Sequence, residues 1–376
     1  MRTRKIVCVI GTRPEAIKMA PVIRALQDTP WARCRVLLTG QHREMVDQAL
    51  KFFGIEPHID LDVMRLKLPL DRLAMHLVKT ISATLASERP DMVLAQGDTT
   101  TVVAAAIASF RQNLPFGHVE AGLRTRRLFA PFPEEANRVV TSHLSALHFA
   151  PTISARTNLE REGISPHAIF VTGNTVIDAL LQTAERDLPI GVDLDPDKRL
   201  ILVTAHRRES FGEPIRQICR AVALLHERFT DVEFLWAVHP NPAIKPIVEA
   251  MLAQRPRIHL APPLAYGPFV SAIMRSTLVL TDSGGIQEEA PALGKPVLVL
   301  RAESERPEAI ASGVAKLVGH DPETIVTEVS RLLSDSAVYG FMAKGTSPYG
   351  DGQAAQRIVA GVASFLGVGG TLRIAS

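Results

Sequence analysis

The sequence predicts an α/β protein built from two doubly wound, Rossmann-like domains. Short apolar runs alternate with segments of helical spacing, which is typical of a parallel sheet covered by helices on both faces. This alternation stops near residue 186 and resumes at residue 200. The chain has 376 residues, of which 46% are hydrophobic, so it is long enough for two domains with separate cores.

The first domain is expected to span residues 1–186. Its strands are predicted at the apolar runs of residues 5–10, 35–39, 92–96, 115–119, 146–150 and 168–172. Residues 187–198 are rich in Pro, Asp and Gly, so we expect them to link the two domains.

The second domain is expected to span residues 187–352. Its strands are predicted at residues 200–204, 232–238, 257–260, 278–281, 297–300 and 314–318. Ligands of doubly wound sheets lie beyond the carboxyl ends of the strands, and the notable polar residues cluster there. We therefore predict an active site in a cleft where the two domains face each other.

Composition argues against several classes of protein. The 42 basic and 39 acidic residues nearly balance, at a net charge of +3, so there is no general attraction to nucleic acid. The three cysteines lack Cys-x-x-Cys spacing, which argues against a disulfide framework and a structural zinc site. No stretch approaches the roughly 20 apolar residues of a membrane span. We expect a soluble cytoplasmic protein.

Residues 278–296 read as a strand, a Ser-Gly-Gly turn and the start of a helix, an arrangement that points backbone N–H groups at an anion. Gly284 and Gly285 lack Cβ atoms, so a phosphate can approach closely, and Ser283 is placed to cap the helix. Glu289 lies on the same helix face and is suited to accept hydrogen bonds from ribose hydroxyls. An ordinary capped helix explains this stretch alone about equally well.

Two arginines are candidates to bind the same anion. Arg13 follows the first strand and stands at a helix N-terminus, where a cation is locally unfavourable without an anionic ligand. Arg306 is expected near the Ser283 turn, where a charge-assisted bond to phosphate is worth about 1.5–3 kcal/mol. The chain has no Gly-x-Gly-x-x-Gly and no P-loop motif, so neither a nicotinamide cofactor nor a triphosphate site is supported.

Asp98, Glu120 and Glu134 follow neighbouring predicted strands and are candidates for proton transfer. Carboxylates brought together raise one another's pKa, which suits general acid and base catalysis. Taken singly, each is better explained as a helix cap or a first-turn charge; their joint placement favours catalysis. A metal site is the competing explanation, but His118 and His143 lack the spacing of metal ligands.

His206 ends the first strand of the second domain, beside Arg207 and Arg208. Neighbouring cations lower the pKa of a histidine, so we expect His206 to be neutral and to act as a hydrogen-bond partner. A purely structural histidine is the simpler alternative.

Together these motifs resemble the non-hydrolysing UDP-N-acetylglucosamine 2-epimerases. The resemblance includes Gly-Thr-Arg-Pro-Glu at residues 11–15, Gly-Asp-Thr-Thr-Thr at 97–101 and Asp-Ser-Gly-Gly at 282–285. It extends along nearly the whole chain through residues 11–21, 41–45, 97–101, 118–125, 133–138, 173–178, 206–210, 239–242, 282–291, 305–309 and 349–354.

The resemblance implies a glycosyltransferase-B-like fold, usually homodimeric, in which a C-terminal helix at about residues 353–366 packs on the first domain. It implies a UDP-sugar substrate, with no cofactor and no metal ion. The catalytic residues that it implies are Asp98, Glu120, Glu134 and His206. The substrate-binding residues that it implies are Arg13, Lys18, Asp98, Glu120, His206, Phe269, Ser283, Gly284, Gly285, Glu289 and Arg306.

The chemistry of such a reaction suits these residues. The C2 proton of the sugar is too weakly acidic for direct removal, because C2 is not next to a carbonyl group. Expulsion of UDP from C1 allows a carboxylate to take that proton and gives 2-acetamidoglucal. UDP is then returned to C1 while a proton reaches the opposite face of C2. A 3-keto mechanism would require nicotinamide, for which the sequence has no motif.

Four other activities remain open at this point. Related 2-epimerases of UDP-diacetamido-uronic acids share the Gly-Thr-Arg-Pro-Glu start, and UDP-sugar glycosyltransferases share the fold. A hydrolysing enzyme would release free N-acetylmannosamine, and a sensor that only binds sugar nucleotides would not need Asp98 and Glu120.

Some members of the family bind a second UDP-N-acetylglucosamine through the loop at Gln41 and His42. Those members have glutamine where this chain has Glu44 and arginine where it has Lys67, which argues against such activation here.

Overall fold

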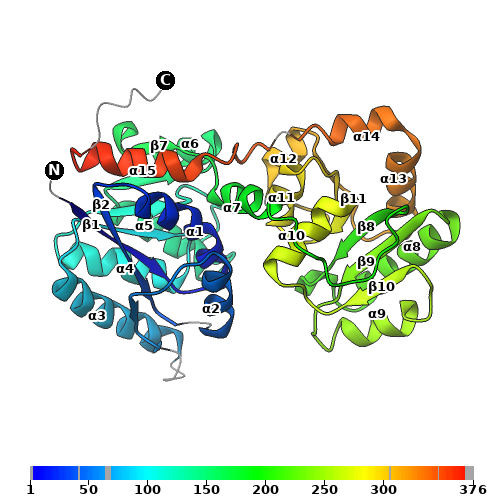
Figure 1. Cartoon of the computed structure of the whole chain (residues 1–376), viewed down its shortest axis with the longest axis horizontal. Coiled ribbons are helices and arrows are strands. Elements are labelled where there is room, and N and C mark those ends of the chain that lie inside the picture. Colours follow the sequence, from blue (N-terminus) through cyan, green and yellow to red (C-terminus); the bar gives the residue numbers. More distant parts are fainter. Residues whose placement is uncertain (1–2, 41–42, 64–68, 305, 346, 369–376) are drawn as a thin grey trace. The chain divides into compact units, whose positions relative to one another are not determined.

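The computed structural model describes residues 3–40, 43–63, 69–304, 306–345 and 347–368. Gln41, His42 and Lys67 therefore lie outside the described residues, as does Glu305. The chain divides into two compact units, one made of Met1–Ala179 with Tyr349–Ser376 and the other of Leu180–Pro348 (Figure 1).

Within the described residues, the first unit contains a seven-stranded parallel sheet in the order β3-β2-β1-β4-β5-β6-β7. Its strands are β1 (Arg4–Ile10), β2 (Ala32–Leu38), β3 (Ile59–Asp60), β4 (Met92–Gln96), β5 (Phe116–Val119), β6 (Leu147–Ala150) and β7 (Ile169–Val171). The apolar runs predicted the strands of this unit except β3. That strand has two residues, which is too short for an apolar run to reveal.

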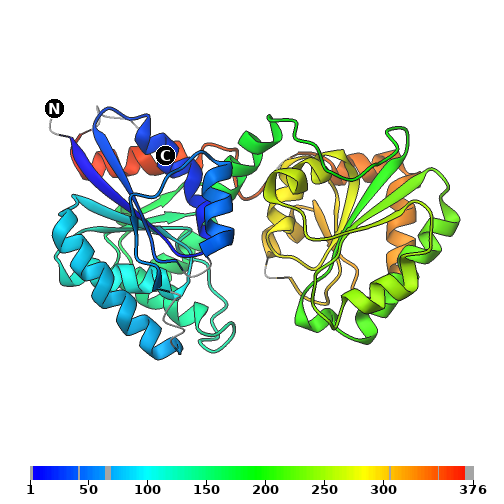
Figure 2. The same cartoon turned by 60° about the horizontal axis from the view of Figure 1, so that its bottom comes forward.

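Helices cover both faces of this sheet (Figures 1 and 2). They are α1 (Arg13–Gln27), α2 (Arg43–Phe52), α3 (Leu70–Glu88), α4 (Thr100–Arg111), α5 (Glu134–Leu144), α6 (Ile153–Arg161), α7 (Thr175–Ala184), which crosses into the second unit, and α15 (Ala354–Phe365), with a 3₁₀ turn at Pro166–Ala168. Helices α3 and α4 pack on Val7, Val9 and Val93, which are fully buried. Ile6, Cys8 and Ile10 alternate with these valines along β1 and are also fully buried, so this strand is apolar on both faces, as a covered parallel sheet requires.

The last helix, α15, belongs to the first unit although it ends the chain. It packs on α1, and the two lie side by side in Figure 1. Asp178 of α7 accepts hydrogen bonds from the first two amides of α15, at 3.2 Å from Ala354 and 2.8 Å from Ala355. The Asn174 amide also donates to the Tyr349 carbonyl at 2.6 Å. These bonds join the C-terminal segment to α7.

Within the residues that the structure describes, the second unit contains a six-stranded parallel sheet in the order β10-β9-β8-β11-β12-β13. Its strands are β8 (Arg199–Thr204), β9 (Val232–Ala237), β10 (Ile258–Ala261), β11 (Ser276–Thr281), β12 (Val297–Val299) and β13 (Ala315–Leu317). Its helices are α8 (Glu213–Arg228), α9 (Lys245–Leu252), α10 (Tyr266–Arg275), α11 (Ile286–Ala292), α12 (Pro307–Ala311), α13 (Pro322–Ser334) and α14 (Ser336–Met342), with a 3₁₀ turn at Arg208–Ser210. Phe234 and Trp236 of β9 lie fully buried in its core.

Each sheet has one point where the strand order reverses. In the first sheet this switch point lies between β1 and β4, and in the second between β8 and β11. The connections that leave two such strands turn to opposite faces, so a crevice opens at their carboxyl ends, where ligands of doubly wound sheets bind. This topology identifies the two strand edges where functional residues are expected.

Cys8 and Cys34 are distant in the sequence but adjacent in space. They lie on the neighbouring strands β1 and β2, with Sγ atoms 3.8 Å apart. A hydrogen bond to Cys34, together with burial, raises the pKa of Cys8 well above its usual range. Both cysteines are free and buried, as is Cys219. The sequence does not reveal this contact, because the two cysteines are 26 residues apart and meet only through the pairing of β1 with β2.

No helix in the part of the chain that the structure describes is long and apolar enough to cross a membrane.

Candidate functional site

The loop after β1 carries Arg13 at the switch point of the first sheet. Helix α1 begins at Arg13, and Pro14 follows it in the first turn, where a proline costs no hydrogen bond. Lys18 lies further along this helix and forms an ion pair with Glu120, with Nζ and Oε2 2.6 Å apart. The sequence motif that contains Arg13 therefore also supplies a cation to one of the predicted acids.

Glu120 follows β5 directly and is held by two donors. Its Oε2 accepts hydrogen bonds from Lys18 and, at 2.7 Å, from the side-chain amide of Gln96 at the end of β4. Its backbone is left-handed, with φ of 64°, a conformation that costs about 1–3 kcal/mol in a residue other than glycine. Its side chain is only 8% exposed. The fold thus holds this carboxylate in a single place at a strained turn.

Asp98 lies in the loop after β4, the other strand of the switch point. Arg138 of α5 donates from Nε to its carboxylate at 2.8 Å, and Asn137 donates to its backbone carbonyl, also at 2.8 Å. Helix α5 therefore fixes both the side chain and the backbone of Asp98.

Glu134 is the first residue of α5. Its Oε2 atom is buried and has no hydrogen-bond partner among the described residues. A buried polar atom without a partner costs free energy unless a ligand or water satisfies it. This orphaned oxygen lies on the helix that also fixes Asp98, so one element carries Glu134 and positions Asp98.

The neighbouring Glu135 has a structural role. Burial alone would raise its pKa, but the Thr125 and Arg126 amides and the Arg138 guanidinium hydrogen-bond it, and together they lower its pKa below the usual range. Arg138 thus bridges Glu135 and Asp98, and Glu135 also anchors the loop between β5 and α5.

The sequence prediction assigned no catalytic or binding role to two buried groups at this edge. Burial raises the pKa of Glu15 to about 7, although Thr99, Gly11 and Thr12 hydrogen-bond it and act in the opposite direction. The spacing Thr-x-x-Glu at residues 12–15 is a capping-box signature, which could have identified this acid as a helix cap. Burial also lowers the pKa of His118 to about 3, so this histidine is neutral and its Nε2 donates to the Gly97 carbonyl at 2.7 Å.

In the second unit, Asp282 organises the loop after β8. This carboxylate is fully buried, and its Oδ2 accepts from the amides of His206 and Arg207, both at 2.8 Å, and from the Ser210 hydroxyl at 2.7 Å. Nδ1 of His206 lies 3.2 Å from the other oxygen, Oδ1. Asp282 follows β11 directly, so its bonds join the loops after β11 and β8 at this switch point.

His206 is held in a partly buried stack. Its ring stacks on that of His239, with ring centroids 6.0 Å apart. Burial lowers its pKa, Arg207 and His239 lower it further, and Asp282 opposes them. The predicted direction of the shift is therefore right, but burial is the main cause and the arginine is secondary.

The Ser-Gly-Gly turn follows Asp282. Helix α11 begins after Gly285, which has no side chain to cap it, so the prediction that Ser283 caps the helix is wrong. The Ser283 amide instead donates to Thr281 Oγ1 at 3.0 Å, and its carbonyl accepts from Gln287. The helix begins at Ile286, so Gly285 and not Ser283 takes the N-cap position.

The fold does not require a glycine at position 285. Its φ is −63°, which any residue adopts, and a Cβ added to it would meet no atom within 4 Å. A Cβ on Gly284 would lie 3.7 Å from Nη2 of Arg207, so this guanidinium lies beside the turn. The Nε atom of Arg207 is buried and has no hydrogen-bond partner among the residues described. The turn therefore combines open space with a nearby cation that the sequence prediction did not assign.

Arg306 precedes α12 and is bound to the helix of the turn. Its Nε forms an ion pair with the buried carboxylate of Glu288. Its amide donates to the Ser304 hydroxyl at 3.0 Å, and that hydroxyl donates to Gln287 at 2.5 Å. Arg306 thus lies against α11, the helix that follows the Ser283 turn, and Glu288 compensates part of its charge.

Glu289 and Phe269 complete the predicted residues of this unit. Glu289 lies in the first turn of α11 and is partly buried. Phe269 lies in α10, also partly buried, and its amide donates to the Ala265 carbonyl at 2.9 Å.

The structure therefore gathers the predicted residues at two strand edges. The carboxyl edge of the first sheet carries Arg13, Lys18, Asp98, Glu120 and Glu134. The loops and helices that follow strands of the second sheet carry His206, Phe269, Ser283, Gly284, Gly285, Glu289 and Arg306. Among the residues described, no group of three His, Cys, Asp or Glu side chains is placed to hold a metal ion.

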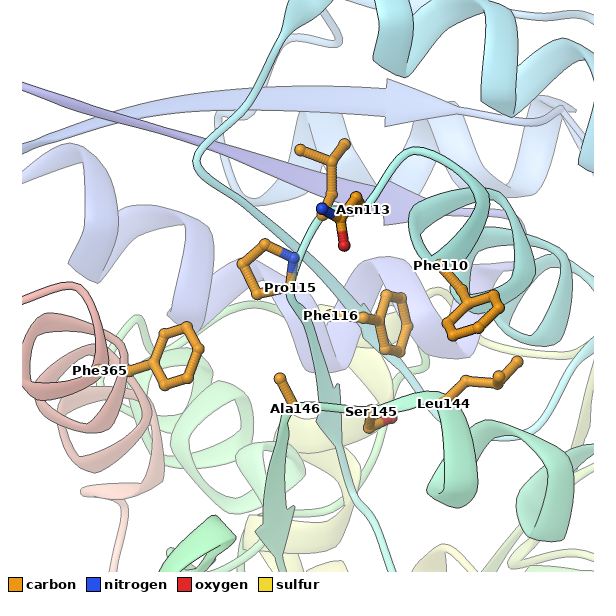
Figure 3. A pocket seen from close by; sticks show the side chains of 9 residues that line it. Phe110, Asn113, Pro115, Phe116, Leu144, Ser145, Ala146 and Phe365 are labelled. Atoms are coloured by element: carbon orange, nitrogen blue, oxygen red, sulfur yellow. The ribbon is translucent and has the colours of Figure 1, made fainter.

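A cavity of about 400 Å³ lies elsewhere in the first unit (Figure 3). It is lined by the end of α4, the residues that lead into β5 and β6, and Phe365 of α15. The amino ends of β5 and β6 are at the opposite edge of the sheet from Asp98 and Glu120, so this apolar cavity is separate from the candidate site.

Comparison with known proteins identifies the family. A family model described as UDP-N-acetylglucosamine 2-epimerase matches residues 24–363. The UDP-N-acetylglucosamine 2-epimerase of Escherichia coli strain K12 is 48% identical over 367 residues, covering 94% of this chain and 97% of that protein. The enzyme of the same name from Salmonella typhimurium strain LT2 is 47% identical, covering 96% and 99% of the two chains.

Solved structures agree with these matches. The UDP-GlcNAc 2-epimerase from Neisseria meningitidis, bound to UDP-GlcNAc, is 43% identical with a TM-score of 0.87, covering 96% of this chain and 100% of that chain. A calicheamicin glycosyltransferase is 18% identical with a TM-score of 0.61 over 98% and 99% of the two chains, which shows a shared fold. The fold is thus the glycosyltransferase-B-like α/β architecture predicted from the sequence. The chain belongs to the UDP-N-acetylglucosamine 2-epimerase family.

Proposed function

We propose that this enzyme interconverts UDP-N-acetylglucosamine and UDP-N-acetylmannosamine by eliminating UDP to give 2-acetamidoglucal and adding it back. Family membership supports the substrate and the reaction class. The observation that carries the mechanism is the set of three acids on neighbouring connections at one sheet edge. One of them, Glu134, has a buried oxygen that no described residue satisfies.

The second unit holds the UDP group. The turn at residues 283–285 accepts the pyrophosphate, because Gly285 is exposed and a Cβ added to it would meet no atom within 4 Å. Arg207 beside the turn and Arg306 against α11 supply positive charge. Arg13 is a further candidate to bind the UDP group. Glu289 accepts hydrogen bonds from the ribose hydroxyls. His206 is neutral and acts as a hydrogen-bond partner of the substrate.

The first unit moves the proton. Elimination requires a base at C2 and an acid near the departing oxygen, and re-addition requires a proton from the opposite face. Asp98, Glu120 and Glu134 provide these groups, and each is held differently: Asp98 by Arg138, Glu120 by Lys18 and Gln96, and Glu134 with one unsatisfied oxygen. Different surroundings for acids at one site are a common basis for different proton-transfer roles.

We further propose that the chain acts as a homodimer in the cytoplasm and uses no nicotinamide. The product would serve the synthesis of a cell-surface polysaccharide. The chain contains no dinucleotide fingerprint.

Product analysis with purified enzyme tests this function. Incubation with UDP-N-acetylglucosamine alone should give a mixture of the gluco and manno nucleotides, separable by chromatography. Steady release of UDP with free N-acetylmannosamine would show a hydrolase instead. Turnover that requires an added acceptor would show a glycosyltransferase. Turnover of a UDP-diacetamido-uronic acid alone would show that this nucleotide, and not UDP-N-acetylglucosamine, is the substrate. Binding without turnover of either nucleotide would indicate a sensor.

A further inference from the structure

Glu15 joins the two loops that carry Arg13 and Asp98. Its Oε2 accepts hydrogen bonds from the Gly11 amide at 2.6 Å and from the Thr12 amide at 3.2 Å. Its Oε1 accepts from the hydroxyl of Thr99 at 2.6 Å. Thr99 follows Asp98 directly, and Arg13 follows Thr12. One carboxyl group therefore connects the loops on both sides of the first switch point.

Helix capping explains only half of these contacts. The bonds to Oε2 form the capping-box interaction at the start of α1, which a glutamate commonly provides. The bond to Oε1 contributes nothing to that cap. Thr99 is the N-cap residue of α4, yet its side chain makes no capping hydrogen bond to its own helix. The hydroxyl of Thr99 is used for Glu15 instead.

The two loops also pack directly on each other. A Cβ added to Gly11 would collide with the side chain of Thr101 and would lie 2.9 Å from Oγ1 of Thr39. Glu15 itself is only 2% exposed. A buried carboxyl group is costly, so a fold that needed only a helix cap would be expected to keep it at the surface. The burial is consistent with a second task at this position.

Asp98 is held from two directions. Arg138 binds its carboxylate at 2.8 Å from the side of α5, and Glu15 binds the following residue from the side of α1. We propose that Glu15 is a positioning residue: through Thr99 it fixes the place of Asp98 relative to Arg13. This inference rests on the proposed function, in which Arg13 binds UDP and Asp98 transfers a proton.

The test compares variants that remove the hydrogen bond between Glu15 and Thr99 from the side of either residue. Glu15→Gln leaves one acceptor oxygen for three donors, and Thr99→Val removes the hydroxyl without changing the shape of the side chain. Each is expected to lower kcat about tenfold, with KM and UDP affinity within about twofold of wild type. Thr99→Ser keeps the hydroxyl and should retain full kcat. The double variant should be no slower than the slower single variant, because both changes remove one interaction.

A matched control removes a different hydroxyl from the same helix. Ser109 is buried near the far end of α4, where it donates to the Ala105 carbonyl at 2.7 Å. Ser109→Ala should leave kcat unchanged. A kcat for Thr99→Val equal to that of Thr99→Ser would overturn the proposal, as would effects of Glu15→Gln and Thr99→Val that simply multiply.

A second readout does not depend on turnover. Amide hydrogen exchange of residues 97–101 should be faster in Glu15→Gln and in Thr99→Val than in wild type and Ser109→Ala. Unchanged exchange would contradict the proposed connection. If wild type failed to convert UDP-N-acetylglucosamine, the proposed function would fall, and the exchange of residues 97–101 would still decide whether Glu15 positions this loop.

Discussion

At the scale of single residues, the partners of the three acids decide what each can do. Asp98 is bound by a guanidinium, Glu120 by an ammonium and an amide, and Glu134 keeps an unsatisfied buried oxygen. The sequence places these acids at neighbouring strand ends, but it does not reveal their partners. Those partners come from α1, β4 and α5 and meet only in the folded chain.

Asp98→Asn should abolish most turnover while preserving the binding of UDP. The amide cannot accept a proton, whereas the residues proposed to bind UDP are unchanged. A loss of at least 100-fold in kcat is expected from the usual contribution of a general acid or base. Isothermal titration with UDP is the second measurement. An equal loss of UDP affinity would assign Asp98 a structural role instead.

Glu15 should make the stability of the chain depend on pH. Burial raises its pKa to about 7 from an ordinary 4.5, so the folded chain binds this proton more tightly than the unfolded chain. The free energy of unfolding should therefore fall as the pH rises from about 4.5 to 7, by up to about 3 kcal/mol.

Urea unfolding of wild type and Glu15→Gln in parallel isolates this contribution. Because the variant cannot titrate, the stability of wild type relative to the variant should decrease between pH 5 and pH 7.5. Parallel curves over this range would show that Glu15 keeps an ordinary pKa in the folded chain.

At the scale of elements, apolar runs locate the strands well because a covered parallel sheet needs them. Strand β3 escapes prediction because two residues are too few for a pattern. The cap of α11 was assigned wrongly because Ser-Gly-Gly resembles a serine cap, whereas in the structure the Ser283 amide bonds to Thr281 and Gly285 takes the N-cap position. The bond between Glu15 and Thr99 joins residues 84 positions apart, and no local pattern predicts it.

Asp178 should stabilise the docking of α15. It is buried and accepts from the first two amides of that helix, which has no side-chain cap of its own. Asp178→Ala should cost about 1–3 kcal/mol and accelerate amide exchange in residues 354–365. Asp321→Ala, which removes the cap of α13 in the second unit, should leave that exchange unchanged. Equal acceleration in both variants would indicate general destabilisation instead.

At the scale of the whole molecule, two sheets of the same kind carry different chemistry at their switch points. The first sheet carries carboxylates with individual partners, and the second carries an open glycine turn beside Arg207. Sequence alone identifies the family and most of these residues, because the motifs follow strand ends in order. It does not reveal Arg207 as a neighbour of the turn, because that contact depends on how Asp282 folds the loop after β8.

Exchange of the C2 hydrogen with solvent is the most direct measurement of the central claim, that this enzyme expels UDP and moves the C2 proton. Wild type is incubated with UDP-N-acetylglucosamine in D₂O and C2 is followed by NMR. The account predicts deuterium at C2 in both the gluco and the manno nucleotide, and none with Asp98→Asn. A manno product that still carries protium at C2 would contradict it.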